Sequence, residues 1–277
     1  MGKTKQTMTD SIIVVRGGGD LATGVIQKLY HAGFNVVVLE TEKPLAIRRT
    51  VALCNAVFEG SQRVEDVIGC LVASVSECKK IWQAGQIPIL IDPQGEAIKL
   101  LEPLVVVDAI LAKKNLGTNK TMAPLTIALG PGFSAPEDVD VVIETMRGHY
   151  LGRLYFKGSA IPNTGIPGEI GGKSAERVIH SPTAGKVTHK KTIGATVKKG
   201  ETLFYVGETP VLSPLDGVLR GLISEQVICQ KGLKCADVDP RPVEKVDCFT
   251  ISDKARALGG AVLEAVLFLG HQKNLFI

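Results

Sequence analysis

The sequence predicts an α/β protein in which a mostly parallel sheet carries a small additional β module and a C-terminal helix that returns to the sheet. Three stretches support this prediction. Residues 12–24 read as a strand, a glycine turn and a helix start. Residues 177–236 contain an internal repeat, and residues 252–269 carry an apolar stripe at helical spacing.

The first stretch is IIVVRGGGDLATG, residues 12–24. Its four β-branched residues, 12–15, predict a strand buried on both faces. The glycines and alanine that follow match G-x-G-x-x-G/A, the first turn of a Rossmann-like dinucleotide-binding unit. The helix start offers N–H groups to a phosphate, although the carboxylate of Asp20 competes for them. The candidate cofactor-binding residues of this turn are Gly17, Gly18, Gly19, Asp20 and Ala22.

A second predicted strand, residues 35–40, ends in Glu40, 21 residues after Gly19. A carboxylate at this distance is expected to accept hydrogen bonds from ribose hydroxyls. Arg48 and Arg49 follow it, and a guanidinium there could hold a phosphate instead or lie in solvent. Adjacent residues cannot share one helix face, so we expect at most one of the two to point toward the sheet edge.

Further strands are predicted at residues 87–92, 104–108 and 126–130, with helices at 76–84 and 95–101. Four or five such βα units form a mostly parallel sheet covered by helices, and ligands bind beyond the carboxyl ends of its strands. The additional candidate ligand-binding residues at those ends are Asp108, Lys113, Asn115, Gly130 and Gly132.

A linker rich in glycine and proline, residues 158–176, precedes the repeat. SPTAG at 181–185 recurs as SPLDG at 213–217, and VKKG at 197–200 recurs as CQKG at 229–232. A duplicated hairpin unit of this kind resembles a biotinyl/lipoyl carrier domain, a flattened β-barrel. The turn between the halves, 206–210, has no lysine to modify, so residues 177–241 are predicted to be a structural or docking module.

The end of the chain predicts one long helix. Ser252 or Asp253 can cap its start, and Leu258, Val262, Val266 and Leu269 form its apolar stripe. We expect this helix to cover the Rossmann-like sheet, because the small β module offers little apolar surface. The predicted division is a nucleotide-binding domain over 9–157, the linker, the β module, and a C-terminal segment over 242–277.

Composition excludes several classes. Aromatic residues make up 5% of the 277-residue chain and the net charge is +4, which does not support stacking along a nucleic acid. No apolar run is long enough to cross a membrane. The six cysteines form no C-x-x-C pair, so we expect no metal site and reduced thiols in the cytoplasm.

Nine motifs together carry a family resemblance: VRGGGDLATG (15–24), LAIRRTVA (45–52), VVDAILAKKN (106–115), LGPGFSAPEDVD (129–140), VIETMRGHYLGR (142–153), NTGIPG (163–168), GVLRGLI (217–223), DVDPR (237–241) and ISDKARALGGAVLEAVL (251–267). The chain resembles the YqeB-type accessory proteins of selenium-dependent molybdenum hydroxylases over nearly its whole length. Its middle resembles the Rossmann domain of XdhC/CoxI-type maturation factors more distantly.

The resemblance implies that the protein takes part in the maturation of another enzyme, and it implies no particular reaction. It implies a nucleotide-bearing ligand such as a molybdopterin dinucleotide, and a molybdenum hydroxylase client as partner. Catalytic residues, enzymatic activity and a homo-oligomeric state are left open. Two alternatives also remain open: an NAD-dependent oxidoreductase, which would share the glycine turn and Glu40, and a non-catalytic assembly protein whose Rossmann-like fold is empty.

Overall fold

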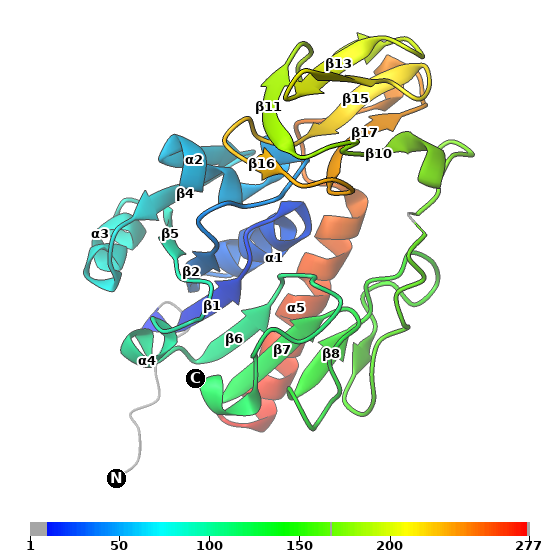
Figure 1. Ribbon diagram of the computed structural model, residues 1–277. Coiled ribbons are helices and arrows are strands. Elements are labelled where there is room, and N and C mark those ends of the chain that lie inside the picture. The colour runs from blue at the N-terminus through cyan, green and yellow to red at the C-terminus, as the bar shows by residue number, and fades with distance from the viewer. Residues whose placement is uncertain (1–9, 167, 276–277) are drawn as a thin grey trace.

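The computed structural model describes residues 10–166 and 168–275, which form a large α/β domain and a smaller β module (Figure 1). The α/β domain contains one nine-stranded sheet in the order β3-β4-β5-β2-β1-β6-β7-β8-β9. Its strands are β1 (Ile12–Arg16), β2 (Asn35–Glu40), β3 (Ser61–Val64), β4 (Val67–Val72), β5 (Ile87–Ile91), β6 (Val105–Asp108), β7 (Leu125–Leu129), β8 (Val141–Ile143) and β9 (Leu154–Tyr155). Only the outermost pairs, β3 with β4 and β8 with β9, are antiparallel. The prediction of a mostly parallel Rossmann-like sheet is confirmed.

The strand β1 lies at the centre of this sheet, between β2 and β6. Successive side chains of a strand point to opposite faces, and both faces of β1 are covered. Val14 packs in one apolar cluster, whereas Ile13 and Val15 pack in another on the other side. The strand order reverses beside β1, which is where open α/β sheets bind their ligands.

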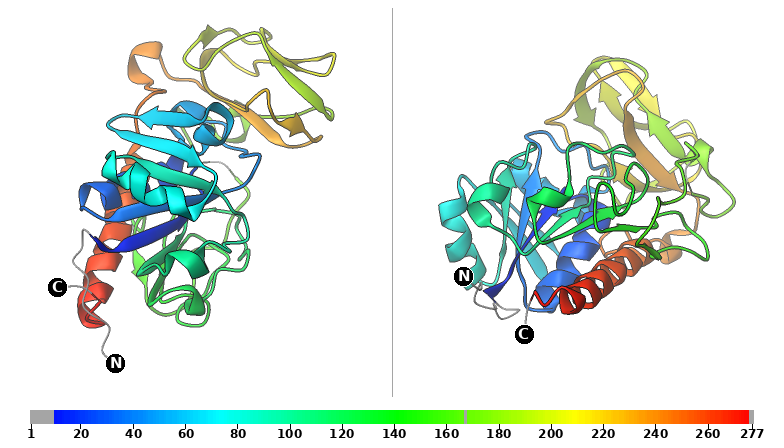
Figure 2. Two further views of the ribbon diagram at one scale, coloured as in Figure 1. Left: turned by 90° about the vertical axis from the view of Figure 1, so that its left-hand side faces the viewer. Right: turned by 90° about the horizontal axis from the view of Figure 1, so that it is seen from below.

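Helices cover both faces of the sheet (Figures 1 and 2). Their bounds are α1 (Asp20–His31), α2 (Ala56–Glu59), α3 (Cys78–Gln83), α4 (Ile98–Leu101) and α5 (Asp253–Gln272), with short 3-10 turns at η2 (Arg49–Val51), η3 (Leu53–Asn55), η4 (Val75–Glu77), η5 (Lys120–Met122), η6 (Ala175–Arg177) and η7 (Val243–Lys245). Helices α1 and α5 share a cluster with one face, and α3 and α4 share a cluster with the other. The Ser252 hydroxyl accepts a hydrogen bond from the Ala255 N–H and caps α5. The predicted return of this helix to the sheet is confirmed.

Two glycines set the close approach of α1 and α5. A Cβ atom built on Gly24 would lie 2.4 Å from the Ala255 carbonyl oxygen. A Cβ built on Gly259 would lie 2.3 Å from the Gly24 carbonyl oxygen. Only residues without a side chain fit at this crossing, so the two helices pack backbone against backbone.

The β module consists of two four-stranded sheets, ordered β10-β17-β15-β12 and β14-β13-β11-β16. Its strands are β10 (Val178–His180), β11 (Gly185–His189), β12 (Thr196–Val197), β13 (Thr202–Val206), β14 (Thr209–Leu212), β15 (Gly217–Leu222), β16 (Ile228–Cys229) and β17 (Lys234–Asp239). The two orders correspond strand by strand under the sequence repeat, and one apolar cluster joins both sheets. The internal duplication is therefore confirmed, while the lipoyl-type barrel class stays a prediction.

The repeated motifs contact each other reciprocally. The Gly200 N–H donates to the Ser213 carbonyl at 2.8 Å, and the Gly232 N–H donates to the Ser181 carbonyl at 2.8 Å. Each S-P-x-x-G turn thus binds the x-x-x-G turn of the other half. This exchange explains why both motifs recur at the same spacing.

We expect no lysine of residues 177–236 to carry biotin or lipoate. The turn that joins the two halves links β13 to β14 through Gly207 and Glu208, and no lysine lies on it. Intact mass spectrometry of protein purified from its own host should give the unmodified mass for this segment. A mass heavier by either group would contradict the expectation.

Candidate functional site

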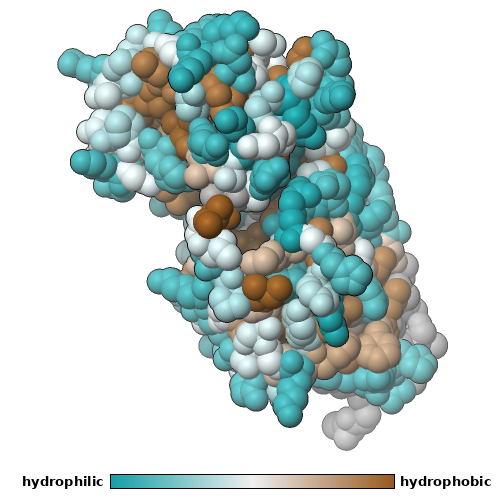
Figure 3. Space-filling view, turned by 90° about the vertical axis from the view of Figure 1, so that its right-hand side faces the viewer, coloured by the Kyte–Doolittle hydropathy of each residue, from teal (hydrophilic) through white to brown (hydrophobic). Residues whose placement is uncertain are grey.

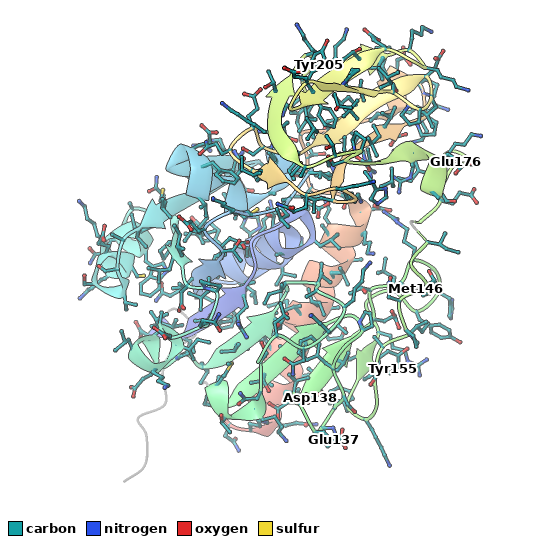
Figure 4. The ribbon with its side chains drawn as sticks, viewed as in Figure 1. Glu137, Asp138, Met146, Tyr155, Glu176 and Tyr205 are labelled. Carbon is teal, nitrogen blue, oxygen red and sulfur yellow. The ribbon has the colours of Figure 1, made fainter. Side chains whose placement is uncertain are left out.

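A cleft of about 1290 Å³ lies between the carboxyl edge of the large sheet and the β module. Figure 3 shows it as a hollow between the two lobes. Figure 4 labels Met146 in its lower wall and Glu176 on the β module above. The α/β side is formed by segments that follow β1, β6, β7 and β8, which is the edge where such sheets bind ligands.

The lining of this cleft is strongly cationic. Its basic side chains are Arg48, Lys113, Arg147, Arg177, Arg220, Lys234, Arg241, Lys245 and Lys254. Its carboxylates are Asp20, Glu169, Asp247 and Asp253, so positive charges outnumber negative ones by five along the wall. Two carboxylates behind the wall, Asp237 and Asp239, reduce this excess but leave it positive. A concave cationic wall attracts anions such as phosphates.

Two buried aspartates of β17 orient the arginines of the β module. Asp237 accepts hydrogen bonds from Arg177 and Arg220 through the same oxygen, Oδ2. Asp239 holds Arg241 in a bidentate pair, with Nε–Oδ1 at 2.9 Å and Nη2–Oδ2 at 2.7 Å. Fixed guanidinium groups of this kind match the geometry of phosphate oxygens.

Residues 17–19 of the glycine turn pack against neighbouring segments of the α/β domain and do not line the cleft. The Gly17 N–H donates to the Leu39 carbonyl, and the Gly18 N–H donates to Glu40 Oε2 at 2.8 Å. The other oxygen of Glu40 accepts from the Thr41 N–H. Burial raises the pKa of the Glu40 carboxyl, and these N–H donors oppose that rise. Glu40 therefore stands at its predicted position but binds the turn itself, and its contact with a ribose stays a prediction.

The three small residues of the motif have distinct surroundings. Gly17 has φ of +92°, and a Cβ there would lie 3.0 Å from the Ala109 carbonyl oxygen. Ala22 is fully buried in the core between helix and sheet. A Cβ on Gly19 would contact no heavy atom within 4 Å. The fold therefore requires glycine at position 17 but not at position 19.

Three predicted site residues do reach the cleft: Asp20, Arg48 and Lys113. Asp20 begins α1, and its Oδ2 lies 3.4 Å from Arg48 Nη1. Lys113 follows β6 on the loop that faces the same space. The start of α1, the segment after β2 and the loop after β6 thus converge on one wall.

Other predicted residues make contacts within the protein, and their part in ligand binding stays a prediction. Arg49 donates from Nε to the Leu222 carbonyl of the β module, because the 3-10 turn η2 points it away from Arg48. Asp108 accepts from the Thr118 hydroxyl at 2.6 Å and from the Ile110 N–H, and burial raises its pKa. Asn115 closes a turn with Gly117 and Thr118.

The second glycine turn is also structural. A Cβ on Gly130 would lie 2.7 Å from Thr145 Oγ1, and one on Gly132 would lie 2.6 Å from the Lys114 Cα. Both glycines allow the loop after β7 to pack on its neighbours, and Pro131 between them lines the cleft.

The prediction missed most of the basic residues. Arg177, Arg220 and Lys234 belong to the β module, for which no ligand-binding residue was predicted. One feature of the sequence did indicate these cations. The segment DVD, residues 237–239, places two acidic residues on β17, a strand otherwise rich in apolar residues, and acidic residues are seldom buried. Buried acids of this kind need cationic partners.

No described helix is both long and apolar enough to cross a membrane. All six cysteines, each within the described ranges, are free thiols. Over residues 10–166 and 168–275, no three histidine, cysteine, aspartate or glutamate side chains gather in a group that could hold a metal ion.

The fold and the cleft define a class: a Rossmann-like α/β protein with a cationic cleft beneath a duplicated β module. The chain is 48% identical over 272 residues to the Uncharacterized protein YqeB of Escherichia coli (strain K12). The match covers 98% of this chain and 50% of YqeB, so the chain spans about half the length of that relative. The chain therefore belongs to the YqeB family, and it corresponds to about half of the YqeB sequence. No family model and no solved structure matches it.

Proposed function

We propose that this chain binds a nucleotide-bearing small molecule in the cleft and acts as an accessory protein in the maturation of molybdenum hydroxylases. The observation that carries the binding proposal is the cationic cleft at the carboxyl edge of the parallel sheet. The proposed role in the maturation of molybdenum hydroxylases rests on the family resemblance of the sequence motifs. The proposed ligand is a dinucleotide form of the molybdenum cofactor, handled as cargo.

The β module has a separate proposed role. We assign it to the biotinyl/lipoyl-like class, because its two halves repeat strand by strand and its connecting turn lies at the tip of the β13–β14 hairpin. Without a lysine on that turn, the module is proposed to close the cleft and to dock on the hydroxylase client in the cytoplasm.

An NAD-dependent oxidoreductase is supported less well. It would use the same glycine turn and Glu40, but hydride transfer also needs a proton donor near the substrate. The described lining of the cleft contains no histidine, and neither Gly17, Gly18, Gly19 nor Glu40 is part of it. His149 instead borders a separate cavity of about 590 Å³ together with Tyr150 and Phe268.

A thermal-shift titration tests the proposal. A ligand present at about 100 times its Kd stabilises the folded state by about 2.7 kcal/mol, so binding should appear as a clear rise in Tm. We expect a molybdopterin dinucleotide to stabilise the protein more than NAD does. The shift should shrink at high salt, because salt screens phosphate contacts.

The other outcomes separate the alternatives. A larger shift with NAD would favour the oxidoreductase, and no shift with any nucleotide would favour an assembly protein with an empty fold. Native mass spectrometry of protein from its own host provides the matching control, since a retained nucleotide identifies the physiological ligand directly. A host strain lacking the chain should also produce hydroxylase with less bound cofactor.

A further inference from the structure

The basic side chains of Arg177, Arg220 and Lys234 form a cationic cluster on the β module, and this cluster has fewer carboxylate partners than cations. Arg177 Nη1 and Arg220 Nη2 share one oxygen of Asp237, while Oδ1 of the same carboxylate has no hydrogen-bond partner among the described residues. Lys234 lies at the start of β17, the strand that also carries Asp237. Within the described ranges it forms no ion pair within 4 Å. Asp237 is thus shared by two guanidinium groups, of which Arg220 also lies 3.9 Å from Asp239 through Nη1.

Burial makes this arrangement costly. The side chains of Arg177, Arg220 and Arg48 are 6%, 16% and 9% exposed. In all three, Nε is buried and has no hydrogen-bond partner within the described part of the chain. Burying guanidinium groups is unfavourable unless opposite charge balances them, so an anion added at the cleft surface of this partly neutralised cluster would be stabilising.

Charge counting indicates the size of that anion. Arg48, Arg177, Arg220, Arg241 and Lys234 contribute five positive charges, and the carboxylates that pair with this cluster, Asp20, Asp237 and Asp239, contribute three negative ones. The remaining excess is two. Burial of the Lys234 ammonium lowers its pKa; the carboxylates of Asp237 and Asp20 oppose this shift, and the guanidinium groups of Arg177 and Arg220 add to it.

The glycine turn is a poor competitor for the same anion. Its N–H groups at Gly17 and Gly18 already have acceptors, and the Leu21 N–H donates to Asp20 Oδ1 at 2.9 Å. The carboxylates of Asp20 and Glu40 also stand at the turn and would repel a phosphate. Three backbone N–H groups at this turn are therefore already bonded to the protein's own oxygens.

We propose that the cleft binds a diphosphate diester through Arg48 on the α/β domain and Arg177, Arg220 and Lys234 on the β module, rather than through the glycine turn. This inference rests on the proposed function for the identity of the ligand. A diphosphate diester carries two negative charges, which equals the excess of the cluster. Because the cations come from both parts of the molecule, the ligand bridges them.

Calorimetric titration with inorganic pyrophosphate tests the assignment. We expect Arg48→Gln and Lys234→Gln each to weaken binding by about tenfold or more, since each removes a charge-assisted contact. Lys231→Gln is the matched control, because Lys231 is exposed on the turn before β17 and does not line the cleft. It should change Kd by no more than about twofold. Gly19→Val should also change Kd by no more than about twofold, because the added side chain enters open space.

The pyrophosphate titration would overturn the assignment if the wild-type protein does not bind, or if Gly19→Val loses binding while Arg48→Gln retains it. Lys234 is exposed, so its variant should fold even if Arg48→Gln does not. If the dinucleotide binds but neither cluster variant weakens it, the assignment fails and the proposed function stands. If pyrophosphate behaves as expected but no nucleotide binds, the proposed function fails and the cluster remains an anion site.

Discussion

Replacing Asp237 with asparagine is expected to lower the free energy of unfolding of the β module by about 3 kcal/mol. The carboxylate is 1% exposed and is the shared acceptor for Arg177 and Arg220. Asparagine keeps the shape but removes the charge, which leaves Arg177 without its counterion and Arg220 with only the more distant Asp239 carboxylate. Breaking a buried pair from one side costs about 3–5 kcal/mol. Urea denaturation followed by circular dichroism measures the loss.

Asp216→Asn is the matched control for this prediction. Asp216 pairs with Lys198 at 3.1 Å, but both side chains are largely exposed. Exposed ion pairs contribute about 0–1 kcal/mol, so the control should stay below about 1 kcal/mol. Similar losses in the two variants would show that the Asp237 pair is no stronger than a surface contact.

Replacing Gly259 with alanine should lower the free energy of unfolding by about 2 kcal/mol. The added Cβ would meet the Gly24 carbonyl at 2.3 Å, so α1 and α5 must separate, and overpacking of this kind costs about 1–3 kcal/mol or more. Alanine favours a helix more than glycine does, which offsets part of the loss. The loss should appear in the cooperative unfolding transition of the α/β domain.

Gly260→Ala provides the control one residue further along the same helix. A Cβ there meets no heavy atom within 4 Å, and the position is exposed. The substitution should therefore raise stability by about 0.5–1 kcal/mol, because alanine loses less backbone entropy on folding. Opposite signs at neighbouring positions would identify the helix crossing as the cause, whereas equal signs would contradict it.

Much of the fold follows from local patterns. The β-branched run of β1 and the apolar stripe of α5 predicted their own burial, because each element must hide its apolar face. The duplication was readable because both halves use the same turn residues at the same spacing. The candidate site was predicted only in part. Its α/β wall follows strand ends and was expected, whereas the cations of the β module were not.

The sequence by itself determined the central strand, the glycine turn, the repeat and the position of Glu40 at the end of β2. Only the tertiary structure decided that Glu40 binds the turn, that Arg48 faces the cleft while Arg49 contacts Leu222, and that Asp237 is shared by two arginines. The physical reason is the range of the interactions. Secondary structure follows from neighbouring residues, whereas hydrogen-bond partners and charge burial depend on segments that are distant in the chain and meet only in the folded protein.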